Sequence, residues 1–310
     1  MDLPSEDALR WVVRSYAEVR NALGTAAGAC RLVQPDGEFF PDDFHHDGPS
    51  LKRLLDRMAG YALVGDHVEL DIGLLDDEGD ASCGAGSSCG CGVDSGAGER
   101  GGRIEASPGL YRVWLQAHEV GRAETLTTVF ARAVGAVVLH ESGAAVDQGS
   151  SEIAAVACGF GVLLLNGAAI WGKSCGGLRM KRATVLAVEQ LAVAQALFTA
   201  LHGIRTSAVR KHLGTTQRAA FDVAHDWAES NPMLVEALRD RPAVLESGVF
   251  ELEPIRGPVG RWLYKRRLQR ELRTVPEPHP RATMTEDQRR RLVEARALVD
   301  EVLGAADSRE

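Results

Sequence analysis

Residues 151–166, with the sequence SEIAAVACGFGVLLLN, form the apolar stretch that decides the fold of this chain. The stretch is long enough for a membrane span, but its glycines and its asparagine weaken that interpretation. A second apolar segment precedes it at residues 126–139 and carries Arg132. Two adjacent apolar helices are typical of the centre of a soluble domain. We therefore expect helices over 124–140 and 151–170 to form a buried core, and we expect no membrane span.

The remaining periodicities predict a mostly helical α+β protein. A third long helix, apolar on a broad face, is predicted over residues 184–201. Strands that alternate apolar and polar residues indicate a small N-terminal sheet. The other predicted elements are helices over 6–23, 50–63, 207–213, 217–230 and 232–239, and strands over 31–35, 68–72 and 110–115.

Composition divides the chain into four parts. Residues 1–75 form the N-terminal helix and strand part of the main domain, and residues 76–109 form a loop rich in glycine and cysteine. Residues 110–255 form the helical core. Residues 256–310 contain a basic helix, a proline-rich linker and a charged C-terminal helix, which together make a helical arm. A glycine-rich segment as long as 76–109 is typical of a functional or a disordered loop.

The overall charge limits the class of partner. The 310 residues are 45% hydrophobic, which is ordinary for a soluble globular protein. Their net charge of −8 argues against general nucleic-acid binding, which needs a clustered basic surface. The acidic N-terminus lacks the pattern of a signal peptide, so we expect a cytoplasmic protein. The basic helix at 256–273 is either a solvated face or a docking surface for an acidic partner. An unidentified protein partner is expected there or at the C-terminal helix.

The order of the segments adds a family resemblance. A turn with the sequence FFP at 39–41 is followed by a strand, a loop, a helix at 124–140, the stretch at 151–166 and the sequence TVLAVEQLAVAQALF at 184–198. This order resembles a group of uncharacterised bacterial proteins with a zincin-like core, over roughly residues 30–230. In that group the first long helix carries His-Glu-x-x-His, and an acidic residue on the next helix supplies a further metal ligand. The resemblance implies a helical core like that of the HExxH metallopeptidases.

The chain departs from that family at the catalytic motif. Residues 132–136, with the sequence RAVGA, stand where His-Glu-x-x-His would be. Zinc hydrolysis needs neutral imidazoles to hold the metal and a carboxylate to accept a proton from its water, and arginine and alanine supply neither. Glu152 lies near the position of the further acidic ligand. The resemblance therefore implies a pseudo-peptidase without peptidase activity, whose degenerate former metal site consists of Arg132, Ala133, Ala136 and Glu152.

Arg132 itself makes a structural demand. A charged side chain inside an apolar helix needs a partner, because an unpaired buried charge is costly. Glu152 and Glu141 are the natural candidates. A pair between Arg132 and either acid would indicate a metal pocket refilled by a salt bridge.

The thiols form a second candidate site. Half of the six cysteines lie within nine residues of the glycine-rich loop, and a fourth lies in the turn KSCGG. In a reducing compartment such clusters bind a metal or carry out redox chemistry, and thiolates suit zinc or another thiophilic ion. The spacing C-x5-C-x-C differs from that of structural zinc sites, so incidental cysteines in a linker remain an alternative. Cys30 and Cys158 are interpreted as ordinary buried cysteines. The candidate metal ligands are Cys83, Cys89, Cys91 and Cys175.

Two main function hypotheses follow. The first is a non-catalytic, pseudo-peptidase-like binding or scaffold protein whose four candidate cysteines hold zinc or a similar metal. The alternative is a thiol- or metal-dependent redox enzyme that uses the same Cys83/Cys89/Cys91/Cys175 cluster, with Lys173 as the nearest base. A third hypothesis is a protein–protein interaction module in which the cysteines have no role.

Overall fold

The computed structural model describes residues 2–62, 64, 68–75, 103–107, 109–174 and 177–257. Residues up to Arg256 form one compact unit. The predictions for the basic helix, the proline-rich linker and the C-terminal helix fall almost wholly outside the described residues, as do those for the cysteine-rich part of the loop.

The described elements confirm the helical α+β class. Helices make up most of the structure, and the strands are short. In chain order the elements are α1 (Glu6–Leu23), η1 (Gly24–Gly28), α2 (Gly48–Tyr61), β1 (Glu69–Leu75), β2 (Arg103–Ser107), β3 (Leu110–Gln116), α3 (Ala117–Val120), α4 (Ala123–Glu141), α5 (Gln148–Ala155), η2 (Val156–Phe160), α6 (Gly161–Ala168), β4 (Ile170–Ser174), β5 (Gly177–Lys181), α7 (Val188–Leu201), α8 (Thr206–Arg210), α9 (Thr215–Ser230), α10 (Pro232–Asp240) and α11 (Pro242–Glu246).

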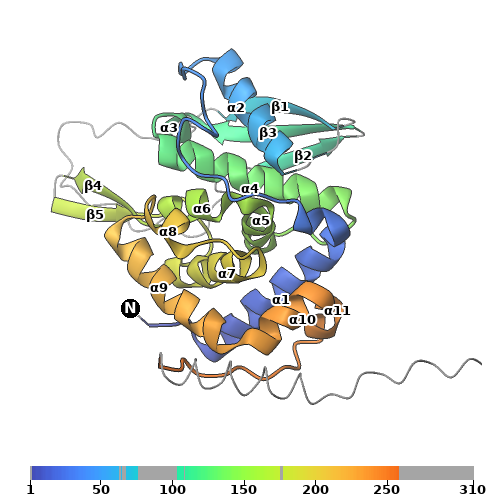
Figure 1. The fold of residues 1–310 in the computed structure, drawn as a ribbon. Helices are drawn as coiled ribbons and strands as arrows, with labels where there is room; N and C mark the ends of the chain where they lie inside the picture. The colour runs from blue at the N-terminus through green and yellow to red at the C-terminus, as the bar shows by residue number, and fades with distance from the viewer. Residues whose placement is uncertain are drawn as a thin grey trace, which may run out of the picture. The chain divides into compact units, whose positions relative to one another are not determined.

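The small sheet lies on one side of the helical core. Its strand order is β1-β3-β2, with β1 parallel and β2 antiparallel to β3. Helix α4 runs along the sheet and contacts β2 and β3, whereas α2 packs against β1 and α4. Figure 1 shows the sheet and α2 at one end of the unit and the remaining helices beyond α4. The sheet therefore fixes the orientation of α4.

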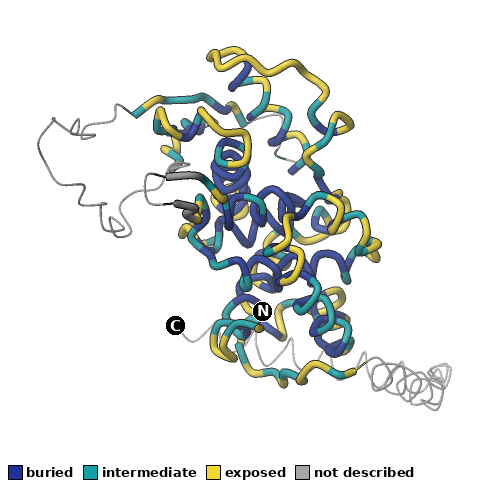
Figure 2. The backbone as a smooth tube through the Cα atoms, turned by 90° about the vertical axis from the view of Figure 1, so that its left-hand side faces the viewer, coloured by how far each residue is buried: buried dark blue, intermediate teal, exposed yellow. Residues whose placement is uncertain are grey.

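The core is built around α4, the α5–α6 segment and α7. These segments are buried along most of their length, whereas the surrounding helices expose one face (Figure 2). Gly135 lets α4 and α5 approach closely, because a Cβ atom there would lie 2.1 Å from the carbonyl oxygen of Ser151. Asp147 caps α5 by accepting hydrogen bonds from the N–H groups of Gly149 and Ser150. The apolar stretch 151–166 thus lies in the core of the protein.

One helical segment has the length and apolar composition of a membrane span. Among the described residues this segment is Gln148–Ala168, and 94% of its most apolar window is buried inside the protein. Burial against other helices is the environment of a core helix.

Several predicted elements differ from the structure. The single helix expected over 151–170 is interrupted by the π turn η2, and Gly159 within it has φ +101°. Residues 31–35 form no strand. Residues 103–107 form strand β2, although the whole of 76–109 is predicted to be a loop. The helix expected from residue 184 begins at Val188, because the preceding residues bind Glu152.

Candidate functional site

The structure pairs Arg132 with Glu152 at the interface of α4 and α5. The two side chains are 3% and 0% exposed, and Arg132 Nη1 lies 3.4 Å from Glu152 Oε1. The pairing expected for a buried arginine is therefore confirmed, with Glu152 as the acid. The other candidate, Glu141, accepts a hydrogen bond from the hydroxyl of Tyr111 at the far end of α4.

Glu152 also fixes the segment that leads into α7. Its carboxylate accepts hydrogen bonds from the N–H groups of Val185 at 2.7 Å and Leu186 at 2.9 Å. Arg132 donates to the carbonyl oxygen of Ala183 at 3.0 Å. Burial raises the pKa of Glu152, while the charge of Arg132 and the two N–H groups lower it. Both carboxylate oxygens are thus occupied, and the arrangement acts as a structural clamp.

The other residues of the predicted degenerate site supply no metal ligand. Ala133 and Ala136 are buried in the core, and their methyl groups have no donor atoms. Within the part of the chain that the structure describes, no group of three or more His, Cys, Asp or Glu side chains could hold a metal ion. The middle of α4 therefore offers packing and a salt bridge.

The predicted cysteine site lies outside the described residues. This applies to all four of its members, Cys83, Cys89, Cys91 and Cys175. The metal site stays a prediction. Cys30 and Cys158, in contrast, are described and are both buried and free, as expected from the sequence.

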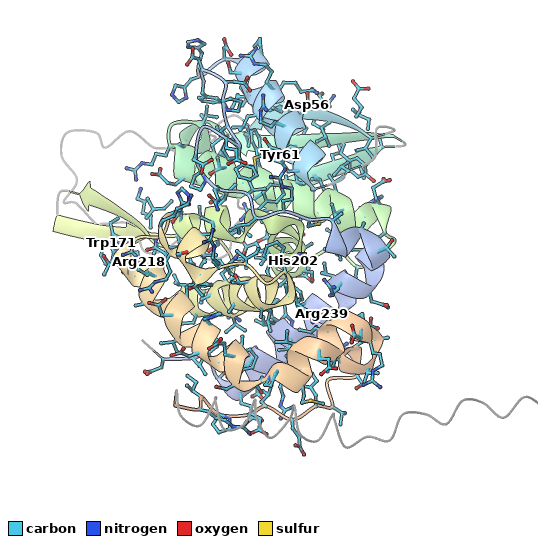
Figure 3. The ribbon with its side chains drawn as sticks, in the orientation of Figure 1. Asp56, Tyr61, Trp171, His202, Arg218 and Arg239 are labelled. Carbon is cyan, nitrogen blue, oxygen red and sulfur yellow. The ribbon has the colours of Figure 1, made fainter. Side chains whose placement is uncertain are left out.

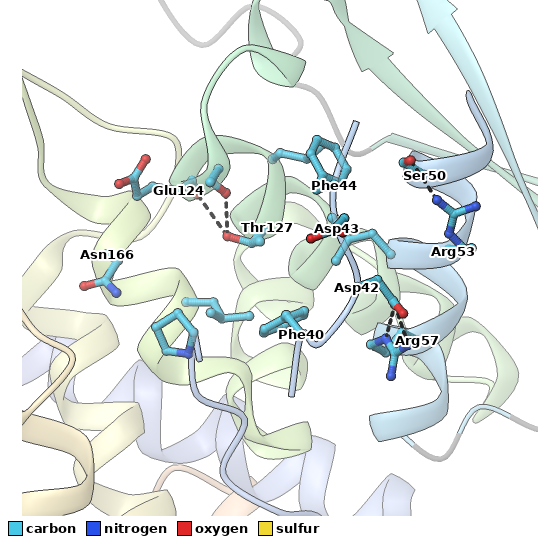
Figure 4. Close-up of a pocket in the computed structure, with 15 residues that line it drawn as sticks. Phe40, Asp42, Asp43, Phe44, Ser50, Arg53, Arg57, Glu124, Thr127 and Asn166 are labelled. Atoms are coloured by element: carbon cyan, nitrogen blue, oxygen red, sulfur yellow. Dashed lines mark hydrogen bonds and ion pairs between the residues drawn. The ribbon is translucent and has the colours of Figure 1, made fainter. Parts of the chain in front are cut away.

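An open pocket lies at the N-terminal end of α4. It has a volume of about 400 Å³, and most of its lining surface is apolar. Leu126 and Leu163 on its inner wall are buried, whereas Phe44 on its rim is 39% exposed. Figure 4 shows the walls, which come from α2, α4, α6 and the segment that precedes α2. The apolar lining residues are Pro35, Phe40, Phe44, Leu54, Ala123, Leu126 and Leu163.

Tyr61 holds one wall of the pocket in place. Its hydroxyl donates a hydrogen bond of 2.6 Å to the carbonyl oxygen of Phe39, and its ring packs edge-on against Phe39 and Phe40. Figure 3 labels Tyr61 at the end of α2. The FFP turn at 39–41 is thus anchored to α2. This anchor keeps Phe40 in the pocket wall.

The charges around the pocket are unequally compensated. Arg57 forms an ion pair with Asp42, and Arg53 donates a hydrogen bond of 2.9 Å to the hydroxyl of Ser50. Asp43 and Glu124 form no ion pair with any described side chain. In the view of Figure 4 these two acids lie on either side of Thr127. The pocket therefore has an apolar interior and a negatively charged rim.

No family model matches the chain, and comparison with curated proteins and with solved structures finds no match.

A second, more polar pocket adjoins the first. Its volume is about 690 Å³, and Glu124 and Asn166 line both pockets. Asn166 donates a hydrogen bond of 3.1 Å to the carbonyl oxygen of His212, which joins α6 to the segment before α9. Trp171 of β4 lines its outer side and is 54% exposed (Figure 3). The two pockets are thus neighbours along one wall.

The sequence contains no motif that marks the first pocket. Its lining residues come from four separate segments, and each is an ordinary member of a helix or a turn. The one available signal is the FFP turn, which places two aromatic residues next to the acidic pair Asp42-Asp43. Aromatic side chains with a few polar groups beside them are typical of the lining of a ligand pocket.

Proposed function

We propose that this chain is a non-catalytic binding protein on a peptidase-like helical core, and that it binds amphipathic cations in the pocket at the N-terminal end of α4. The class of ligand is a small molecule, or a side chain of a partner, with an apolar body and an amine. The observation that carries the proposal is an open apolar pocket at the end of α4, with two carboxylates that form no ion pair within the described part of the chain.

The closed interior supports the non-catalytic part. Arg132 and Glu152 form an ion pair at the position that the family resemblance assigns to the metal site. Glu152 is 0% exposed and already accepts two backbone hydrogen bonds. A carboxylate in that environment has no route to a substrate, whereas a general base must come within hydrogen-bond reach of its proton.

The size and lining of the pocket support the binding part. Ligand pockets are typically about 300 to 1,000 Å³, mostly apolar, with a few polar groups that fix orientation. This pocket has about 400 Å³ and an apolar interior between Phe40, Leu126 and Leu163. Phe44 is exposed on its rim and would lose that exposure when a ligand covers it.

The charge pattern supports a cationic ligand. Of the two arginines of α2 that line the pocket, Arg57 pairs with Asp42, whereas Arg53 donates to the neutral hydroxyl of Ser50 and is outnumbered by the two remaining acids. Asp43 and Glu124 are exposed acids on the same rim. An amine next to either acid would gain a charge-assisted hydrogen bond without displacing an ion pair.

The test compares three probes with one carbon skeleton: phenylbutylamine, phenylbutanol and phenylbutyrate. Binding to the full chain is followed by NMR titration, and the amine should bind with a Kd of about 0.1 to 1 mM, ahead of the alcohol and the carboxylate. Phe44→Ala should weaken the binding of every probe about fivefold, because it removes apolar contact area. The double variant Asp43→Asn/Glu124→Gln should weaken only the amine, also about fivefold.

Two surface variants serve as controls. Met233→Ala removes an exposed apolar side chain from α10, and Glu236→Gln removes an exposed acid from the same helix. Neither residue lines the pocket, so neither variant should change any Kd. Equal binding of phenylbutyrate and phenylbutylamine would refute the cationic class. Unchanged binding in Phe44→Ala would place the ligand elsewhere and refute the site.

A further inference from the structure

Two buried cysteines from distant parts of the sequence meet inside the protein. Cys30 follows η1 and is 5% exposed, and Cys158 lies in the π turn η2 and is 0% exposed. Their segments meet in the backbone, because residues 31–33, which follow Cys30, contact Gly159, which follows Cys158. The Cys30 thiol also donates a hydrogen bond to the carbonyl oxygen of Ala26, at 3.6 Å. The thiols therefore form a pair, although the sequence gives each of them the appearance of an ordinary core residue.

The backbone holds the two segments together beside the thiols. The N–H group of Val33 donates a hydrogen bond of 3.0 Å to the carbonyl oxygen of Gly159. Gly159 has φ +101°, and a Cβ atom there would lie 1.9 Å from the carbonyl oxygen of Arg31. A glycine is therefore required next to Cys158, both for its conformation and for the close approach of residues 31–33. π turns of this kind are frequent at functional sites.

The surroundings give the two thiols different acidities. The hydrogen bond from Cys158 and the positive charge of Arg20 lower the pKa of Cys30. The neighbouring Cys30 side chain and burial both raise the pKa of Cys158. Cys30 is 5% exposed and Cys158 is 0% exposed, so Cys30 is the thiol that a small oxidant would reach first.

We propose that Cys30 and Cys158 are a site of reversible oxidation, at which a small peroxide converts the thiol pair into an intramolecular disulfide. The Cys30 thiolate attacks one oxygen of hydrogen peroxide, the O–O bond breaks, and Cys30 becomes a sulfenic acid with release of hydroxide. The Cys158 sulfur then attacks the Cys30 sulfur, the S–O bond breaks, and water leaves with the proton of Cys158. Two thiols and one hydrogen peroxide thus give one disulfide and two waters, and a dithiol reductant reverses the change.

The disulfide would join the N-terminal segment to the central helix. The cross-link closes the chain between residues 30 and 158, which restricts the unfolded state and stabilises the folded one. We expect the melting temperature to rise by about 5 to 10 °C on oxidation. Cys30 is only 5% exposed, so the oxidant has to be small, and bulky disulfides should not react in the folded state.

The experiment is a mass map of the full chain after treatment with hydrogen peroxide, unfolding in an alkylating agent and proteolysis without reductant. The expected product is a peptide containing Cys30 joined to one containing Cys158, lighter by two hydrogens than the two thiol peptides together. Dithiothreitol should remove it. Cys158→Ala and Cys30→Ala should each abolish the product and the rise in melting temperature, whereas Cys175→Ser should keep both.

Three results would overturn the proposal. Recovery of both cysteines fully alkylated after peroxide treatment would show that they are inert core residues. Cys30 could be recovered as a sulfinic acid without a cross-link, or joined to a cysteine of the glycine-rich loop. Because the wild-type mass map decides between these outcomes, the test holds even if an alanine variant fails to fold.

Discussion

Removing one partner of the buried Arg132–Glu152 pair should destabilise the protein strongly. In Glu152→Gln the guanidinium of Arg132, which is 3% exposed, keeps the carbonyl of Ala183 but loses its counter-charge. In Arg132→Met the carboxylate of Glu152 stays buried with two backbone N–H donors. Breaking a buried pair from one side costs about 3 to 5 kcal/mol. Total stabilities are about 5 to 15 kcal/mol, so either variant loses a large fraction of its free energy of unfolding.

The double variant Arg132→Met/Glu152→Gln should be more stable than either single variant. It lacks both charges of the buried pair, and the remaining cost comes from a backbone N–H group that loses its acceptor and from the carbonyl of Ala183, which loses its donor. Leu186 donates to Glu152 Oε2, and an amide nitrogen at that position cannot accept this hydrogen bond. An unsatisfied buried donor costs about 1 to 3 kcal/mol. The expected order of stability is therefore wild type, then the double variant, then the two single variants.

The pH dependence separates the two single variants. Burial already raises the pKa of Glu152 above its ordinary value of 4.5, and Arg132 lowers it. Without Arg132 the pKa of Glu152 rises further. An acid whose folded pKa exceeds its unfolded pKa contributes stability that is fully present below the unfolded pKa and is lost as the pH rises through the folded pKa. The deficit of Arg132→Met should thus be smallest near pH 4.5 and largest at pH 8, whereas Glu152→Gln should not show this dependence.

Urea denaturation followed by circular dichroism measures these differences, with linear extrapolation for each variant. Lys52→Met is the matched control, because Lys52 and Asp56 form an exposed i,i+4 pair with side chains 41% and 49% accessible. Such a pair contributes less than about 1 kcal/mol. If Arg132→Met and Glu152→Gln cost no more than Lys52→Met, or if their costs simply add in the double variant, the clamp is not a structural element and the reasoning fails.

Two further outcomes are expected. Gly159→Ala should cost at least about 3 kcal/mol, since φ is +101° and the new Cβ would lie 1.9 Å from the carbonyl oxygen of Arg31. Gly203→Ala, at φ +62° with no atom within 4 Å, should cost only about 1 kcal/mol in the same denaturation assay, and equal costs would contradict the requirement for close approach. Protein purified without a metal-affinity column should contain about one equivalent of zinc or another thiophilic metal by elemental mass spectrometry. Serine substitution of the four candidate cysteines should remove it, and metal-free wild-type protein would end the hypothesis of a cysteine-ligated metal at Cys83, Cys89, Cys91 and Cys175.

Local signals made the regular helices predictable. The expected helix over 6–23 is α1, Glu6–Leu23, because a 3.6-residue apolar period coincides there with a capping serine whose hydroxyl accepts a hydrogen bond from Ala8. The expected helix over 124–140 is α4, Ala123–Glu141. In both segments propensity, pattern and tertiary packing favour the same conformation.

The differences arise where a distant segment decides the local conformation. The helix expected over 151–170 is broken at Gly159, because residues 31–33 approach its backbone and bind its carbonyl oxygen. No pattern within the helix contains that information. Strand β2 is likewise defined by its pairing with β3 in a stretch of weak strand propensity. Sequence periodicity predicts which face of a segment is buried, but it does not identify the segment that packs against that face.

The candidate site likewise has one feature that the sequence predicts and others that it does not. The Arg132–Glu152 pair could be predicted, because the cost of burying a charge requires a partner whatever the fold. The pocket could not, since no physical rule requires residues of four segments to leave a space. The proximity of Cys30 and Cys158 is not predictable for a similar reason, because the burial of each thiol is satisfied without the other.

Helix α4 contributes both to the pocket and to the buried ion pair. Its first turns line the pocket with Glu124 and Thr127, and its middle is fixed to α5 by Arg132 and by the close approach at Gly135. Arg132 and Glu152 do not line the pocket, so the loss of their pair should lower the free energy of unfolding while the folded fraction keeps its ligand affinity. Loss of the exposed rim residue Phe44 should do the reverse, because its surface contributes to the pocket and little to the core. The proposed binding function therefore predicts that substitutions along α4 change the free energy of unfolding and the ligand affinity independently.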